Sequence, residues 1–170
     1  NEAAKASAKE GMHAMYMLQN ASGTPGLVAR SVMPLEEAKK AGKDQDPQWR
    51  LTPDGAMYWK SDTSSDEIDG HYLAFYTYWE HIAKDDPGER ETCIRQVRAL
   101  TDYIVDNGYV LLDWDGKRTR WGFWSPELLN NRPEHYLECG LNSLQILSFL
   151  KTAHYITGVE KYNQHYESLM

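Results

Sequence analysis

Apolar residues recur at intervals of three or four positions in five segments of this 170-residue chain. That interval gathers them on one face of an α-helix, which can then pack against a neighbouring helix. Most of the intervening segments are short, so successive helices should form antiparallel hairpins. We therefore expect an all-α protein built from helical hairpins. The predicted helices cover residues 2–19, 64–84, 87–107, 134–157 and the stretch from 159 onward.

The ends of two predicted helices carry specific signals. Ser64 and Glu67 have the Ser-x-x-Glu spacing of a capping box at the start of the second helix. Pro87 suits the first turn of the third helix, and Gly108 is placed as the glycine that ends it. These signals support the boundaries that the apolar pattern gives.

Two segments depart from the helical pattern. Asp115-Gly116 separates two short runs of β-forming residues, which predicts a β-hairpin near residues 109–124. Residues 20–63 contain four prolines and several glycines, so they predict a long loop with one short helix over 35–41. A loop of this length inside a compact domain usually has a functional role.

Charge and motif content exclude several classes of function. The formal net charge is −7, which opposes binding to nucleic acid or to an anionic membrane surface. No apolar run reaches the roughly 18 residues that a membrane-spanning helix needs. Phosphate-binding glycine loops are absent, and Cys93, Cys139 and the dispersed histidines lack metal-binding spacing. We expect no cofactor, no metal, and neither a nucleic-acid nor a membrane partner.

Tryptophan and tyrosine dominate the aromatic residues, with 6 and 11 copies against 3 of phenylalanine. Their rings combine a flat apolar face with a hydrogen-bonding group, which suits contact with sugars and also suits the interior of an ordinary domain. Together with the negative charge, this composition favours a neutral partner such as a carbohydrate.

Three stretches and one turn carry a resemblance to a known family. The stretches are Gly26–Arg30, Trp59–His71 and Asp115–Pro126, and the turn is Ile156–Tyr162. They resemble a little-characterised bacterial family of six-hairpin, glycosidase-like proteins. The resemblance implies an (α/α)6 toroid and activity on carbohydrates, and it supplies no assigned catalytic residues.

The chain is short for a complete toroid, because twelve helices with their turns need upward of about 250 residues. We therefore expect residues 1–170 to be either a single domain or a segment of a six-hairpin domain. A segment would leave two apolar edges, covered by the remainder of a parent chain or by a second copy in a homodimer. The expected edge residues are Ala4, Ala8, Met12 and Met15 on one side and Tyr162, Tyr166 and Leu169 on the other.

The sequence leaves the cellular compartment open. It begins Asn1-Glu2-Ala3 and shows no basic-then-apolar targeting segment. A signal peptide on a longer parent chain would indicate a periplasmic or secreted protein.

Acidic residues at the start of the second helix are the candidate catalytic groups. Glycoside hydrolysis uses two carboxyl groups, one to protonate the leaving group and one to activate water or attack carbon. Asp66 lies three positions before Asp69, on one face of the helix, and Asp62 precedes both. We expect Asp66 to act with Asp62 or Asp69. Alternatively, these acids only stabilise the positive end of the helix dipole.

Candidate substrate-binding residues come from the same regions. Indole rings can stack on the apolar face of a sugar, while arginine and histidine can hydrogen-bond its hydroxyl groups. At least two of the acids should share one cavity with Trp121 or Trp124. The candidate binding residues are Trp59, Trp121, Trp124, Arg30, His71 and Arg120.

Other functions remain open from the sequence alone. A non-catalytic carbohydrate-binding domain or a helical scaffold would use the same acids only as helix caps. A polysaccharide lyase or a sugar epimerase on the same toroid could use Tyr58, Tyr72 or His71. A glycoside hydrolase is the interpretation that the acidic cluster favours most.

Overall fold

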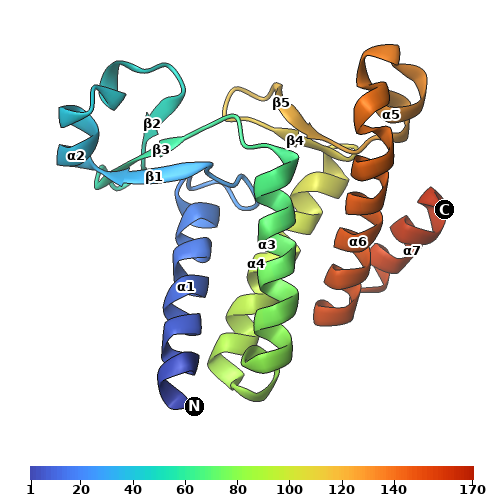
Figure 1. Ribbon diagram of the computed structural model, residues 1–170, viewed down its shortest axis with the longest axis horizontal. Coiled ribbons are helices and arrows are strands. Elements are labelled where there is room, and N and C mark those ends of the chain that lie inside the picture. Colours follow the sequence, from blue (N-terminus) through green and yellow to red (C-terminus); the bar gives the residue numbers. More distant parts are fainter.

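The computed structural model describes all 170 residues and contains seven α-helices and two small antiparallel sheets (Figure 1). Short helices occur where prolines interrupt the chain, at α2 (Leu35–Lys40) and α5 (Pro126–Asn131). The protein is therefore mostly helical, and the expectation of an all-α protein is only roughly right. The long helices are α1 (Glu2–Asn20), α3 (Ser65–His81), α4 (Pro87–Asp106), α6 (Cys139–Thr157) and α7 (Glu160–Leu169).

The long helices run in two directions. Figure 1 shows α3 and α6 descending side by side, while α1, α4 and α7 ascend. Side-chain contacts confirm the parallel pair, because Asp69 meets Gln145 and Glu80 meets Tyr155 at separations of 76 and 75 positions. A nearly constant separation is possible only when two neighbouring helices point the same way.

Short connections produce the antiparallel neighbours. The 3-10 turn Ala83–Asp85 joins α3 to α4, and Gly158 with Val159 joins α6 to α7. Gly158 has φ +67°, a backbone conformation that glycine adopts without steric cost. The sequence-based expectation of helical hairpins is confirmed for these two pairs.

The main core lies where α3, α4, α6 and α7 meet. Tyr72 of α3 stacks on Phe149 of α6, with ring centroids 4.2 Å apart and planes 8° from parallel. Phe75, Leu100 and Tyr162 are fully buried in the same cluster. These four helices therefore bury apolar side chains against one another, as their sequence patterns require.

Most predicted helix boundaries are confirmed. Ser64 and Glu67 form the capping box, and Pro87 occupies the first turn of α4. The helix expected from residue 134 begins instead at Cys139, because Pro133–Glu138 forms a 3-10 helix. Pro133 occupies the first turn of this 3-10 segment, so the continuous α-helix begins one segment later than the apolar spacing predicts.

Residues 20–63 are not one long loop. They contain the strands β1 (Ser31–Pro34), β2 (Trp49–Leu51) and β3 (Met57–Lys60), which form an antiparallel sheet in the order β1-β3-β2. The expected short helix is confirmed as α2. The loop prediction was wrong because strands of three or four residues are too short to show a clear alternation.

The predicted β-hairpin is confirmed as β4 (Val110–Leu112) and β5 (Arg118–Phe123). Gly116 has φ +74° in the turn, but Asp115 does not have a positive φ. The connection is therefore a longer turn closed by Asp113 and Lys117, and not the two-residue turn that Asp-Gly suggests. Gly122 is needed for a different reason, because a Cβ there would lie 2.6 Å from Thr119 Oγ1.

The expected open edges are only partly present. Tyr162 is buried against α4 and donates a hydrogen bond to Asp102 at 3.1 Å, so the α7 edge turns inward and the expectation for Tyr162 is wrong. On α1, Ala4 and Ala8 are exposed while Met12 is buried. Large exposed apolar residues lie instead on α3 and α6: Leu73, Tyr76, Leu141, Leu144 and Tyr155.

Both sheets and α5 lie at one end of the molecule, at the top in Figure 1, where α3 and α6 begin. The opposite end has only tight turns. None of the helices combines the length and apolar character that crossing a membrane would require. The irregular end therefore gathers the segments that the sequence marks as candidate functional regions.

Candidate functional site

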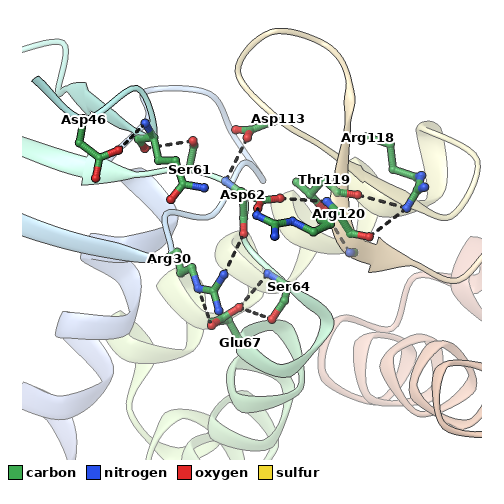
Figure 2. A network of polar contacts seen from close by, with 12 residues as sticks. Arg30, Asp46, Ser61, Asp62, Ser64, Glu67, Asp113, Arg118, Thr119 and Arg120 are labelled. Atoms are coloured by element: carbon green, nitrogen blue, oxygen red, sulfur yellow. Dashed lines mark hydrogen bonds and ion pairs between the residues drawn. The ribbon is translucent and has the colours of Figure 1, made fainter. Parts of the chain in front are cut away.

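Asp62 links the start of α3 to the β4–β5 hairpin. Its carboxylate accepts hydrogen bonds from the Arg120 backbone N–H at 2.9 Å and from Arg120 Nη2 at 2.8 Å (Figure 2). The backbone N–H of Asp62 donates to Asp113 Oδ2 at 3.0 Å. Asp62 also has φ +57°, an uncommon conformation for a residue with a side chain. Its carboxylate is therefore committed to holding the hairpin.

Glu67 and Arg30 form the second half of this polar network. One oxygen of Glu67 accepts hydrogen bonds from the backbone N–H and the hydroxyl of Ser64, which completes the capping box. The other oxygen lies 3.1 Å from Arg30 Nε (Figure 2). Arg30 also donates to the carbonyl oxygen of Asp62 at 3.4 Å. Arg30 thus joins the segment before β1 to the start of α3.

Asp66 and Asp69 lie outside this network, on the exposed face of α3. Asp66 forms no ion pair. Asp69 Oδ2 accepts a hydrogen bond from Nε2 of Gln145, on α6, at 3.2 Å. Of the three acids that the sequence singled out, two therefore remain available to a ligand.

A groove of about 550 Å³ runs between α3 and α6, on the face where their side chains are exposed. Its floor is the stacked pair Tyr72 and Phe149. Gly70 opens one wall, since a Cβ there would meet no atom within 4 Å. The lining residues are Asp69, Gly70, Tyr72, Leu73, Tyr76, Ser148, Phe149 and Thr152.

The far end of this groove is bounded by a pair of tyrosines. The rings of Tyr76 and Tyr155 have centroids 6.1 Å apart. The Tyr155 hydroxyl donates to Glu80, and this hydrogen bond, together with one from Lys84, lowers the pKa of Glu80. The groove thus has an acidic end at Asp69 and an aromatic end at Tyr76.

The tryptophans do not line the groove. Trp59 is 3% exposed and packs against Ala21, Leu27 and Ala29. Trp124 is 1% exposed, and its indole N–H donates to Gln145 at 2.9 Å. Neither indole offers a face on which a sugar could stack. Trp121 is 47% exposed on β5, beside Arg120.

The expected cavity shared by two acids and a tryptophan is therefore not this groove, which takes Asp69 alone from that set. The acids do not share this groove because their side chains point in different directions. Its side chain turns toward the hairpin, while the groove lies on the face of α3 that carries Asp69. Sequence spacing alone does not distinguish these directions.

His71 lies in the interior, 1% exposed, with its ring 6.1 Å from that of Phe75. Its Nδ1 atom has no hydrogen-bond partner. Burial lowers the pKa of His71 to about 4, against a smaller opposing effect of the Glu67 charge. His71 is therefore a neutral core residue near pH 7 and does not reach a ligand in the groove.

Sequence reasoning missed the contribution of α6. Gln145, Ser148 and Thr152 follow one another at intervals of three and four positions, which places them on one helix face. The regular spacing of these three polar residues on one face was the available signal. No group of three or more histidine, cysteine or acidic side chains is arranged to hold a metal ion.

Comparison with known proteins finds no matching family model, no similar curated protein and no similar solved structure. The function of this protein therefore has to follow from the groove and the network themselves.

Proposed function

We propose that this protein is a glycoside hydrolase and that its substrate binds in the groove between α3 and α6. The observation that carries the proposal is the groove lining, which combines one carboxylate, hydroxyl groups and aromatic edges. A sugar presents the matching surface, with hydroxyl groups around its rim and apolar C–H groups on its faces. The net charge of −7 favours a neutral sugar over an anionic one.

The proposed reaction uses Asp66 and Asp69, because Asp62 is bound by Arg120 and Glu67 by Ser64 and Arg30. Hydrolysis requires one carboxyl group to donate a proton to the glycosidic oxygen. The second, ionised group activates a water molecule or attacks the anomeric carbon. Asp69 lines the groove directly, and Asp66 lies one turn earlier on the same helix face.

The arrangement of helices supports a further part of the proposal, that the chain is a segment of an (α/α)6 toroid. The parallel pair α3 and α6 corresponds to an inner row, and α1, α4 and α7 to an outer row running the other way. In this arrangement, the exposed apolar residues of α3 and α6 would face the toroid axis.

A lyase or an epimerase has less support. Thr101 already donates its hydroxyl proton to the Val97 carbonyl, so the Tyr72 hydroxyl donates to Thr101 at 2.7 Å. Burial raises the pKa of Tyr72, which opposes its use as a base. His71 is also enclosed in the core. Two of the three residues suggested for those reactions, Tyr72 and His71, are therefore buried core residues.

The test is to block the groove without touching a carboxylate. Gly70→Leu projects a side chain into the open space of the groove, while Gly11→Leu adds the same side chain on α1, where a Cβ also meets nothing within 4 Å. We expect Gly70→Leu to abolish binding and release of reducing ends across a panel of neutral oligosaccharides. Gly11→Leu should leave both unchanged.

Two results would contradict the proposal. One is a wild-type protein that neither binds nor cleaves any sugar of the panel. The other is a Gly70→Leu variant that binds sugar as well as the wild type does. Binding without cleavage, unaffected by Asp69→Asn, would instead establish a non-catalytic carbohydrate-binding domain.

A further inference from the structure

Asp69 is connected to the buried residue Trp124 through one side chain. Gln145 is 3% exposed and lies between them. Its Oε1 accepts from Trp124 Nε1 at 2.9 Å, and its Nε2 donates to Asp69 Oδ2 at 3.2 Å. The three side chains form a continuous path from the core to the acidic end of the groove.

The indole fixes the direction of this path. A tryptophan Nε1–H can only donate, so the Gln145 atom that faces it must be the amide oxygen. The amide nitrogen is then directed at Asp69, and it too can only donate. Asp69 must therefore accept, which an ionised carboxylate does with either oxygen.

The supporting residues hold this geometry rigidly. Trp124 packs edge-on against Phe149, with centroids 5.6 Å apart. One turn before Gln145, Asn142 donates to the Phe123 carbonyl at 2.8 Å, which fastens β5 to α6. Because Trp124 directly follows this anchored residue, its indole N–H has a fixed position relative to Gln145.

We propose that Gln145, oriented by Trp124, is a positioning residue that holds Asp69 as the ionised carboxylate of the catalytic pair. Asp69 is then the base or nucleophile of the proposed pair. This inference rests on the proposed function in its catalytic part. Its structural part, the fixed hydrogen bond from Gln145 to Asp69, can be tested without any substrate.

Few other groups near Asp69 could form an ion pair or a hydrogen bond with its carboxylate. The titratable neighbours on α3 are Asp66 and the two groove tyrosines, Tyr72 and Tyr76. The side chains that α6 contributes at this end, Gln145 and Ser148, carry no charge. No basic residue lines the groove, so no ion pair replaces the amide hydrogen bond.

The first experiment measures kcat and KM for Gln145→Leu. Loss of a hydrogen bond to a charged group should lower kcat/KM by about 10- to 100-fold. The loss should fall on kcat with little change in KM, because Gln145 does not line the groove and acts only through Asp69. Gln164→Leu, a change of the same kind at an exposed position of α7, should alter neither quantity.

Trp124→Phe provides a second variant that leaves Gln145 in place. The amide then loses its only orienting donor, so its nitrogen no longer has to face Asp69. We expect kcat to fall as it does for Gln145→Leu, with a smaller loss. Trp114→Phe, which changes an exposed indole in the turn between β4 and β5, is the matched control. An unchanged kcat in both Gln145→Leu and Trp124→Phe would overturn the proposal.

The second experiment needs no activity. The side-chain amide protons of Gln145 should change their NMR chemical shift as the pH is lowered through the range in which carboxylates titrate. In Asp69→Asn this change should disappear, although the amide can still donate to the new side-chain oxygen. If the shifts respond identically in both proteins, Gln145 does not sense Asp69 and the inference fails. If the wild type shows no turnover but the amide shifts respond as expected, the proposed function is wrong while the hydrogen bond from Gln145 to Asp69 stands.

Discussion

Two groups of acidic residues lie within eight positions of each other at the start of α3, and the fold uses them differently. Asp62 and Glu67 are held by Arg120, Arg30 and Ser64 in the polar network. Asp69 lines the groove, Asp66 is exposed one turn earlier on α3, and neither acid pairs with a basic residue. The difference shows that acidic residues close in sequence can divide into groups that assemble the structure and groups left free for a ligand.

This comparison predicts that changes in the groove affect function and that changes in the network affect stability. The largest expected effect belongs to Asp69→Asn. Removal of a general base or nucleophile should lower turnover by about 10²- to 10⁴-fold. The free energy of unfolding should change little, since asparagine can still accept from Gln145. Steady-state kinetics and urea unfolding measure the two quantities. A large loss of stability would show that Asp69 stabilises the fold, as Asp62 and Glu67 of the polar network do.

Acid should destabilise the protein through His71, next to the network. Its pKa is about 4 in the folded protein and near 6.5 when exposed. Above pH 6.5 the imidazole is neutral in both states. Between pH 6.5 and 4 only the unfolded chain binds the proton, so stability should fall by up to about 3 kcal/mol.

Urea unfolding at several pH values measures this loss. His71→Gln should flatten the dependence on pH in this window, whereas His81→Gln, at an exposed position, should not. Equal slopes in the wild type and His71→Gln would show that His71 is solvated in the folded protein.

A smaller effect is expected for Asp62→Ala, about 2 kcal/mol of destabilisation, because Arg120 loses its charged acceptor. Asp62→Gly loses the same hydrogen bonds but suits φ +57°, so it should be more stable than Asp62→Ala by about 1 kcal/mol. Thermal unfolding of the two variants separates the hydrogen bonds from the backbone strain. Sugar hydrolysis per folded molecule should persist in both variants. Its loss would show that Asp62 takes part in catalysis.

The smallest expected effect is a gain in stability. Gly70→Ala should stabilise the protein by about 0.5–1 kcal/mol, because alanine favours a helix and its Cβ meets no atom within 4 Å. Gly26→Ala should do the reverse, since its Cβ would lie 2.3 Å from the Ala99 carbonyl oxygen at φ +84°. Thermal unfolding checks both, and destabilisation by Gly70→Ala would mean that the groove is closed in solution.

Local features of the fold could be predicted from the sequence. The capping box at Ser64, the proline at the start of α4 and the Asp115-Gly116 turn depend on residues only a few positions apart. The apolar spacing of α1, α3 and α4 depends on neighbours within each helix. Short-range interactions of this kind are determined by the order of the residues, so the sequence alone is enough to recognise them.

The site depended on contacts between distant segments. Gln145 meets Asp69 across 76 positions, and Asp62 meets Arg120 across 58. The sheet in residues 20–63 likewise pairs strands too short to be recognised singly, such as β1 with β3.

The sequence by itself determined which residues could form helices, caps and a hairpin turn, and which side chains could carry charge. Only the tertiary structure decided that Asp62 anchors the hairpin, that Trp59 and Trp124 are buried, and that Asp69 faces a groove. The physical reason is that an isolated helix has no inside or outside. A side chain becomes core, anchor or ligand-facing only when the partner that covers its face of the helix is in place.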